Sequence, residues 1–188
     1  RFAWLINGTP TAYDSIYGPV TKKMKGLIDY DEKIFSEYAK LAGVLDVDDL
    51  KEIEKAKQEI AKKIRVDYAT LKKSADPLQA VYAITDHAKT LLYGISDGQL
   101  PSNVGGGYNL RVLLRRALGF IDEFKLNIDL YDVCEMHAKY LKKMDPRLTE
   151  HLENVEEILK VEKLRFLETR GRAIKIINDV IKGDHKIS

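Results

Sequence analysis

Apolar residues recur every three or four positions along nearly the whole chain, which is the spacing of one face of an α-helix. No segment keeps the strict alternation of apolar and polar residues that is typical of a half-buried strand. The pattern predicts helices over residues 2–6, 12–17, 20–42, 52–64, 77–93, 110–124, 130–143 and 146–182. We therefore expect an all-α protein, folded as an irregular multi-helix bundle with one long C-terminal helix.

Residues that typically begin and end helices support these boundaries. An aspartate directly before a proline indicates a helix start, because the aspartate can cap the helix and proline is tolerated at its first position. Asp76–Pro77 and Asp145–Pro146 both fit this pattern. Asp46 or Asp48 can cap the helix that includes residue 52, and Gly183 is a typical helix end.

Composition narrows the possible classes of protein. The net charge is only +2 over 188 residues, so contact with nucleic acid would require local clustering of basic side chains. The single cysteine, Cys134, excludes an internal disulfide and a multi-cysteine zinc site, and its helical surroundings predict a buried side chain. No apolar run approaches the roughly 18 residues of a membrane span, and no signal-peptide pattern opens the chain. We expect a soluble, cytoplasmic protein with no membrane partner.

The most informative segment covers residues 97–116. Pro101 biases the residue before it toward extended geometry, so the preceding helix should end there. Ser102 and Asn103 then give a short polar loop. The three consecutive glycines Gly105–Gly107 leave a backbone that another chain can approach closely.

Three arginines follow the glycines on the next predicted helix. Arg111 and Arg115 lie one turn apart on one face, with Arg116 beside them, and no acidic residue occurs between Tyr108 and Ile121. A polar loop, an open backbone and clustered guanidinium groups suit a nucleic-acid backbone and groove. Glycine triplets also simply link elements, and helical arginines usually face water. These features alone therefore fit a plain loop–helix junction as well.

Together with other motifs, this segment resembles alanyl-tRNA synthetases of the archaeal type. That family has a helix carrying an Asp-His pair, a turn of the form A-D-G-x-x-P-S-N, and then G-Y-x-L-R followed by R-R-A. The matching residues here are 83–87, 96–98, 101–111 and 115–117. Residues 1–5 and 8–14 resemble the family's stretch at and just after the third class II motif.

The resemblance implies an organisation for the chain. Alanyl-tRNA synthetases are ligases of protein biosynthesis that attach alanine to its tRNA using ATP. Residues 1–20 would be the C-terminal edge of the class II catalytic domain. Residues 21–188 would be a helical tRNA-recognition region, with a boundary near 122–146 if it holds two subdomains. Because the chain starts with Arg1 and not with methionine, we expect it to be part of a longer protein.

The resemblance also implies where the chemistry lies. No catalytic residue, cofactor or metal is expected within this chain, and the fragment alone is expected to be inactive. Arg1 would match the ATP-binding arginine of motif 3 in the whole enzyme. ATP and magnesium would serve that enzyme's catalytic domain, and zinc its editing domain. These domains and the acceptor stem of tRNA(Ala) are the expected partners, and DNA is not.

The family identifies its tRNA by a G·U wobble pair in the acceptor stem, and Asn103 stands at the family's reader asparagine. From the minor groove, its oxygen could accept from the guanine amine and its NH₂ could donate to the uracil O2 or a ribose. A second reader, an aspartate, would fall beyond Ser188. The alternative for one of the arginines is that it pairs with an acid and is structural. The residues expected to contact tRNA are Asn103, Gly105, Gly106, Gly107, Tyr108, Asn109, Arg111, Arg115 and Arg116.

Two further interpretations stay open at this point. Composition and the long charged helix alone would also fit a helical protein-interaction module without RNA binding. The Asp86–His87 pair invites a catalytic interpretation. We favour a structural one, in which the pair ties its helix to a neighbouring loop, because no serine or cysteine can be placed beside it as a nucleophile.

Overall fold

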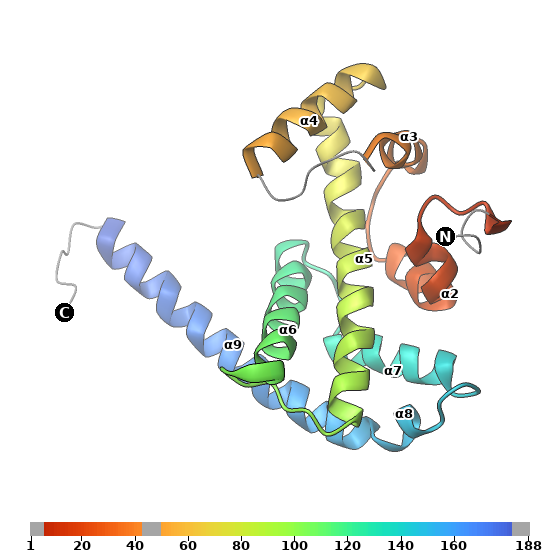
Figure 1. Ribbon diagram of the computed structural model, residues 1–188. Coiled ribbons are helices and arrows are strands. Elements are labelled where there is room, and N and C mark those ends of the chain that lie inside the picture. The colour runs from red at the N-terminus through yellow and green to blue at the C-terminus, as the bar shows by residue number, and fades with distance from the viewer. Residues whose placement is uncertain (1–5, 43–49, 182–188) are drawn as a thin grey trace.

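The structure is a computed structural model that describes residues 6–42 and 50–181 (Figure 1). These residues form helices and no strand, which confirms the predicted all-α class. The longest described helix is the C-terminal one, with 30 residues, as predicted. The helices are α2 (Ala12–Lys25), α3 (Glu32–Ala42), α4 (Leu50–Lys63), α5 (Tyr68–Ser96), α6 (Gly105–Glu123), α7 (Leu130–Leu141), α8 (Arg147–Glu150) and α9 (Leu152–Ile181).

Helix α5 is the central element of the fold. It contacts α2, α3, α4, α6, α7, α8 and α9, and Figure 1 shows α2 and α3 on one side of it and α6 on the other. Its buried side chains lie on several faces and include Leu71, Leu78, Ile84, Leu91 and Leu92. A helix that is covered on most sides needs apolar residues around most of its circumference. The sequence of α5 therefore lacks the single apolar stripe of a surface helix.

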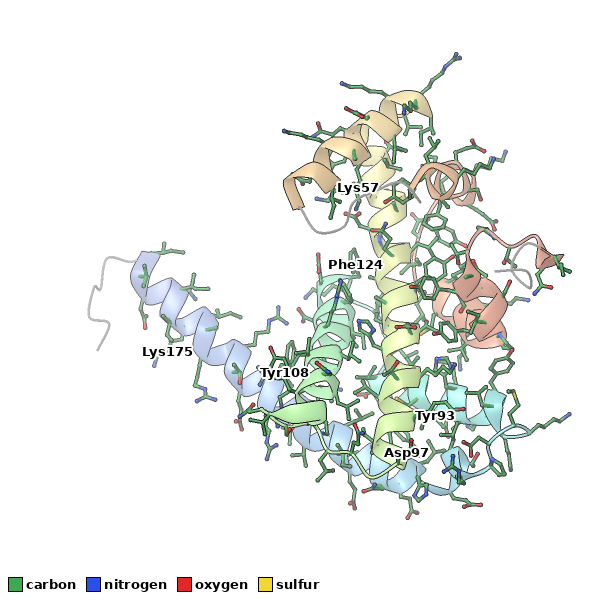
Figure 2. The ribbon with its side chains drawn as sticks, viewed as in Figure 1. Lys57, Tyr93, Asp97, Tyr108, Phe124 and Lys175 are labelled. Atoms are coloured by element: carbon green, nitrogen blue, oxygen red, sulfur yellow. The ribbon has the colours of Figure 1, made fainter. Side chains whose placement is uncertain are left out.

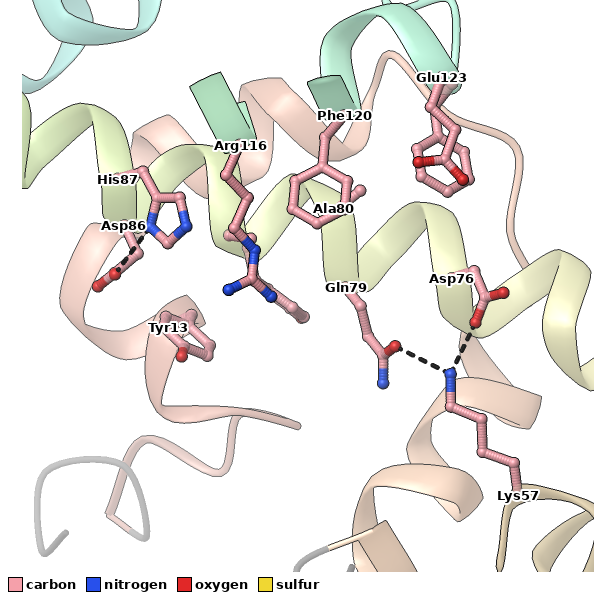
Figure 3. Close-up of a pocket in the computed structure, with 13 residues that line it drawn as sticks. Tyr13, Lys57, Asp76, Gln79, Ala80, Asp86, His87, Arg116, Phe120 and Glu123 are labelled. Carbon is pink, nitrogen blue, oxygen red and sulfur yellow. Dashed lines mark hydrogen bonds and ion pairs between the residues drawn. The ribbon is translucent and has the colours of Figure 1, made fainter. Parts of the chain in front are cut away.

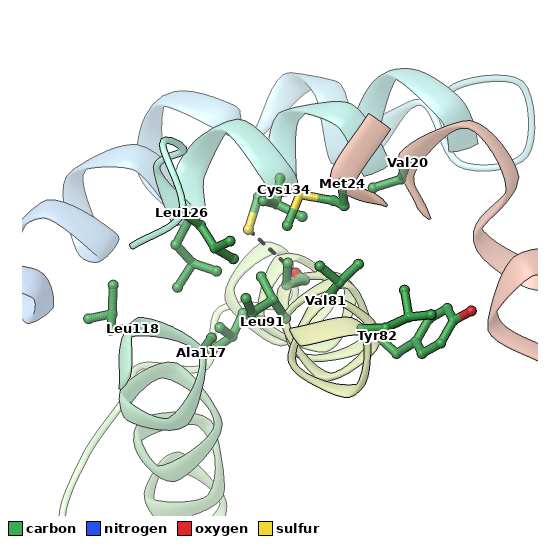
Figure 4. Packing of buried hydrophobic residues seen from close by; sticks show 14 of the residues in the cluster. Val20, Met24, Val81, Tyr82, Leu91, Ala117, Leu118, Leu126 and Cys134 are labelled. Carbon is green, nitrogen blue, oxygen red and sulfur yellow. Dashed lines mark hydrogen bonds between the residues drawn. The ribbon is translucent and has the colours of Figure 1, made fainter. Parts of the chain in front are cut away.

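The core lies where α2, α6 and α7 pack onto α5 (Figure 4). Met24, Leu91 and Ala117 are fully buried there and come from three different helices. Cys134 of α7 is also fully buried, as predicted, and its thiol donates to the carbonyl of Ala88 at 3.4 Å. Burial raises the pKa of this thiol to about 12, so Cys134 fills the core and is not a reactive group.

The predicted helix start at Asp76–Pro77 is wrong. Helix α5 runs through Pro77 and begins nine residues earlier, where the Asp67 side chain caps it by accepting from the Thr70 amide at 2.9 Å. Asp76 instead pairs with Lys57 of α4 at 2.9 Å. Pro77 costs the helix one backbone hydrogen bond, and the packing of α5 against its neighbours outweighs that loss.

The single helix predicted over 20–42 is also wrong, because α2 and α3 are separate helices. The Asp31 carboxylate caps α3, since its Oδ1 accepts from the amides of Lys33 at 2.8 Å and Ile34 at 3.0 Å. The predicted interruption near Gly18 is present as a kink inside α2, where Gly18 has a φ of 37°. Helix α2 ends at Lys25 with Gly26 as its C-cap, and a charged cap at Asp31 then begins a new helix without a proline.

The C-terminal helix begins later than predicted. The Asp145–Pro146 pair directly precedes the short α8, and the Asp145 carboxylate pairs there with Arg147 at 2.8 Å. Helix α8 ends at Glu150, and α9 starts at Leu152. Within the described residues, no helix is both long enough and apolar enough to cross a membrane. Some predicted boundaries fall on residues outside the described part of the chain, namely 2–5, Asp46, Asp48 and Gly183.

Candidate functional site

The distinctive segment forms the loop between α5 and α6 together with the first turns of α6. Helix α6 begins at Gly105, five residues before the predicted start at Leu110. The glycines are therefore helical residues and not a linker. Val104 precedes the helix and provides no side-chain cap, and Gly105 and Gly106 are exposed. The uncapped N–H groups at such a helix start favour negatively charged groups.

The three glycines have different roles. Gly105 has a φ of +61°, a conformation that other residues rarely adopt. Gly107 lies against the loop, where an added Cβ would come within 2.2 Å of the Leu100 carbonyl oxygen and 2.4 Å of the Ser102 hydroxyl. Its own carbonyl accepts from the Ser102 amide at 2.9 Å. At Gly106 the nearest atom to an added Cβ is 3.6 Å away, so only Gly106 is free of a structural requirement.

Replacing Gly107 with alanine is expected to lower the free energy of unfolding by about 1–3 kcal/mol, the usual cost of forcing an extra methyl group into a packed site. Gly106→Ala is the matched control, because its methyl group meets only ordinary contacts and should leave stability unchanged or slightly raised. Urea denaturation of both variants measures the difference. Equal stabilities would mean that the loop does not rest on Gly107.

Asn103 lies exposed in this loop, and Arg111 holds its side chain. Arg111 Nη1 donates to Asn103 Oδ1 at 2.5 Å, and Arg111 Nη2 donates to the Pro101 carbonyl at 3.1 Å. A guanidinium group can only donate, so the amide oxygen must face Arg111. The Asn103 NH₂ group then has no hydrogen-bond partner among the described residues and remains a free donor at the surface.

Arg111 also joins the loop to α9. Its Nε and Nη2 atoms donate to the two oxygens of Glu162 at 3.1 and 3.0 Å. The Glu162 side chain is 4% exposed and the Arg111 side chain 16%, and Arg165 Nη1 adds a bond to Glu162 at 2.6 Å. Arg111 is therefore the arginine that pairs with an acid, which was one of the alternatives that the sequence left open.

Sequence reasoning missed Glu162, although the sequence contains a signal for it. Val155, Leu159, Glu162 and Phe166 are spaced by four, three and four residues, which is the spacing of one helix face. Three of these side chains pack into or against the core. An acid in line with them must be buried, and a buried carboxylate needs a cationic partner.

Arg115 and Arg116 differ from Arg111. Both are exposed, and neither forms an ion pair with any residue that the structure describes. Figure 3 shows Arg116 reaching from α6 toward His87 and Tyr13, and its guanidinium group lies 5.7 Å from the centre of the Phe120 ring. The predicted basic cluster is therefore divided: Arg111 supports the loop, whereas Arg115 and Arg116 remain available to an anion.

The other predicted contact residues lie on the exposed surface at the start of α6. Tyr108 is 53% exposed, and Asn109 is exposed beside it. Figure 2 shows Tyr108 near the start of α6 and Asp97 near the end of α5, where the loop begins. Tyr108, Asn109 and Asn103 thus belong to one end of α6.

The pocket in Figure 3 has a volume of about 650 Å³ and lies against α5. Asp86 accepts from the Tyr17 hydroxyl at 2.6 Å, which ties α5 to helix α2 and not to a loop. The Asp86 carboxylate is 3.4 Å from His87 Nδ1, and burial lowers the pKa of His87. No serine or cysteine is among the described residues that line the pocket. The geometry therefore fits the structural interpretation of the Asp86–His87 pair.

Among the described residues, no group of three or more His, Cys, Asp or Glu side chains is arranged to hold a metal ion. Arg1, the predicted ATP contact, lies outside the described residues. The candidate site at the start of α6 is a surface that carries hydrogen-bond donors and cations, a combination suited to binding an anion.

Comparison with known proteins gives the chain a family. The model of the tRNA synthetases class II (A) family matches residues 1–188. Alanine–tRNA ligase of Nitrosopumilus maritimus is 39% identical over 176 residues, which are 90% of this chain and 19% of that protein. The enzymes of Methanococcus maripaludis and Thermococcus kodakarensis are each 36% identical, over 93% and 94% of this chain and 20% of their own length. The chain therefore spans about a fifth of the length of the curated relatives it matches.

Proposed function

The chain belongs to the class II tRNA synthetases of the alanyl type, and we propose that it is the part of such an enzyme that binds the acceptor stem of tRNA(Ala). It reads the G·U wobble pair from the minor groove so that the catalytic domain can attach alanine using ATP. The observation that carries this proposal is the free, outward NH₂ group of Asn103, whose oxygen is held by Arg111.

The geometry supports one half of the chemistry expected of Asn103. The amide oxygen is engaged by Arg111 at 2.5 Å, so the group that is left for RNA is the NH₂ donor. In an A-form minor groove this donor can meet the uracil O2 or a ribose hydroxyl. Recognition of the guanine amine then belongs to an acceptor other than Asn103.

The surrounding surface supports contact with phosphates. The uncapped start of α6 at Gly105 and Gly106 offers backbone N–H groups to an anion. Arg115 and Arg116 are exposed cations without an acidic partner among the described residues. The rise per residue of an α-helix places these two arginines about 15 Å along α6 from Gly105 and Gly106. Several phosphates of one strand cover such a distance. Tyr108 and Asn109 would contact the sugar–phosphate backbone beside them.

The proposal includes the organisation that the resemblance implies. Residues 1–20 are the edge of the catalytic domain and residues 21–188 the recognition region. ATP, magnesium and the editing zinc belong to other parts of the enzyme, and the chain alone has no ligase activity.

The outer half of α9 supports contacts with those other parts. Figure 1 shows α9 extending away from the bundle. Its exposed apolar side chains are Val161, Leu164, Leu167, Ile174, Ile176, Ile177, Val180 and Ile181, and among them Leu164, Leu167, Ile174, Ile177 and Ile181 recur at helical spacing. A stripe of this kind is typical of a surface that packs against another domain. It would equally serve a helical protein-interaction module without RNA binding, which is the second candidate function. Binding of an acceptor-stem minihelix separates the two.

Replacing Asn103 with alanine in the full-length synthetase is expected to reduce the preference for a G·U over a G·C minihelix by about fivefold or more. A good base contact of this kind contributes about 1–3 kcal/mol of discrimination. The measurement compares kcat/KM for aminoacylation of the two minihelices by the wild type and the variant.

Asn127→Ala is the matched control, because Asn127 is also an exposed loop asparagine but follows α6 and not α5. It should leave the preference unchanged. An unchanged preference in a stably folded Asn103→Ala enzyme would show that Asn103 is only a loop residue, and the proposal would fail.

A further inference from the structure

The buried carboxylate of Glu162 and the exposed side chain of Asn103 both bond to the same arginine, Arg111. Glu162 of α9 accepts two parallel bonds from Arg111, at 3.1 Å from Nε and 3.0 Å from Nη2. This two-point contact fixes the plane of the guanidinium group as well as its position. Arg111 is therefore held by α9, although it belongs to α6.

The same guanidinium group fixes Asn103. Its Nη1 donates to Asn103 Oδ1 at 2.5 Å, and its Nη2 donates to the Pro101 carbonyl at 3.1 Å. No other described residue bonds to the Asn103 side chain. The chain of contacts thus runs from Glu162 through Arg111 to Asn103.

An exposed asparagine that nothing holds can turn its amide over, because the torsion at its end is broad and roughly two-fold. Each half-turn exchanges the NH₂ donor for the oxygen acceptor. Arg111 prevents this exchange, since it offers only donors and therefore retains only the oxygen. The surface then always presents the NH₂ group outward.

We propose that Glu162, acting through Arg111, is a positioning residue for Asn103, and that this Glu162–Arg111–Asn103 relay gives the amide the polarity needed to discriminate the wobble pair. The inference rests on the proposed function. It adds a residue on α9, outside the loop, to the determinants of tRNA selectivity.

The test uses the full-length synthetase and the G·U and G·C minihelices. Arg111→Lys keeps the charge but cannot bond to both partners in one plane, and Glu162→Gln keeps the shape but loses half of the two-point contact. Each is expected to reduce the ratio of kcat/KM values for the two minihelices by about threefold to tenfold, a part of the effect of a good base contact. Far-ultraviolet circular dichroism and melting temperatures establish that each variant is folded.

A matched control comes from the same two helices. Arg170 of α9 pairs with Asp122 of α6 and does not touch the loop. Arg170→Lys should leave the ratio unchanged. A double variant adds the sharpest comparison: in an Asn103→Ala background, Arg111→Lys should cause no further loss of selectivity, because it acts only through Asn103.

The outcomes separate this inference from the proposed function. If Asn103→Ala reduces the ratio but Arg111→Lys does not, the relay is wrong and Asn103 still reads the pair. If Arg111→Lys reduces the ratio equally with and without Asn103, Arg111 acts by another route and the relay is also wrong. If Asn103→Ala has no effect, both ideas fail together. Should Glu162→Gln not fold, Arg111→Lys and the double variant decide.

Discussion

Replacing Glu162 with alanine is expected to lower the free energy of unfolding of this chain by about 3–5 kcal/mol, the usual cost of removing one partner from a buried ion pair. Glu162 is 4% exposed and accepts bonds from both Arg111 and Arg165. Arg165 is 59% exposed and can return to water. Arg111 is largely buried and would keep its charge without an acid beside it. Urea denaturation followed by circular dichroism measures the loss.

Two controls test the reason for this loss. Glu168→Ala removes an exposed acid from the same helix and should change stability by less than about 0.5 kcal/mol. The double variant Arg111→Met with Glu162→Leu removes both charges together, and such apolar pairs are often as stable as the ion pair they replace. It should recover most of the stability while losing the support of Asn103. If Glu162→Ala is no worse than Glu168→Ala, the ion pair contributes little to the fold.

The helical class and most helices could be predicted from the sequence, because an amphipathic face leaves a periodic trace. The errors occur where tertiary contacts outweigh local signals. Pro77 looks like a helix start, but α5 is covered on most sides and continues through it. Between α2 and α3, the chain leaves the helix at Gly26 and starts the next one after the Asp31 cap, although apolar residues continue through the segment between them.

The candidate site shows the same division. Asn103 could be selected from its motif, and an exposed loop position is consistent with that choice. The partner of Arg111 could not be selected, because Glu162 is 51 residues away in the sequence and nothing local links the two. The glycines also look equivalent in the sequence. Only packing distinguishes Gly107, where an added Cβ would collide with the loop, from Gly106, where it would make only an ordinary contact.

The stability of the chain is expected to fall as the pH is lowered from 7 to 5, with His137 contributing about 2 kcal/mol of the loss. The pKa of His137 is lowered to about 4, mainly because the ring is buried, while the bond to the Thr85 carbonyl and the charge of Asp86 oppose this shift and the charge of Lys89 adds to it. Its Nε2 lies 2.8 Å from that carbonyl, so Nε2 carries the proton of the neutral ring. Nδ1 is buried without a partner among the described residues, and a second proton there would be an unpaired charge.

The direction of this pH dependence follows from the different pKa of His137 in the folded and the unfolded chain. In the unfolded chain His137 has an ordinary pKa near 6.5 and takes up a proton first, so protonation favours unfolding. The stability it contributes is complete above pH 6.5 and is lost as the pH falls toward 4, where the loss reaches about 3 kcal/mol. Urea denaturation at pH 7, 6 and 5 measures this dependence in the wild type and in His137→Gln.

The difference between the two proteins isolates His137, because other groups contribute equally to both. Burial also lowers the pKa of His87, which adds to the slope of each protein but not to their difference. The Thr70 hydroxyl holds the pKa of Asp67 below its usual range, so the contribution of Asp67 is lost only at still lower pH. The wild type should therefore lose about 2 kcal/mol more than His137→Gln between pH 7 and pH 5. If the free energy of unfolding fell equally with pH in the wild type and in His137→Gln, the His137 ring would accept a proton without leaving the core.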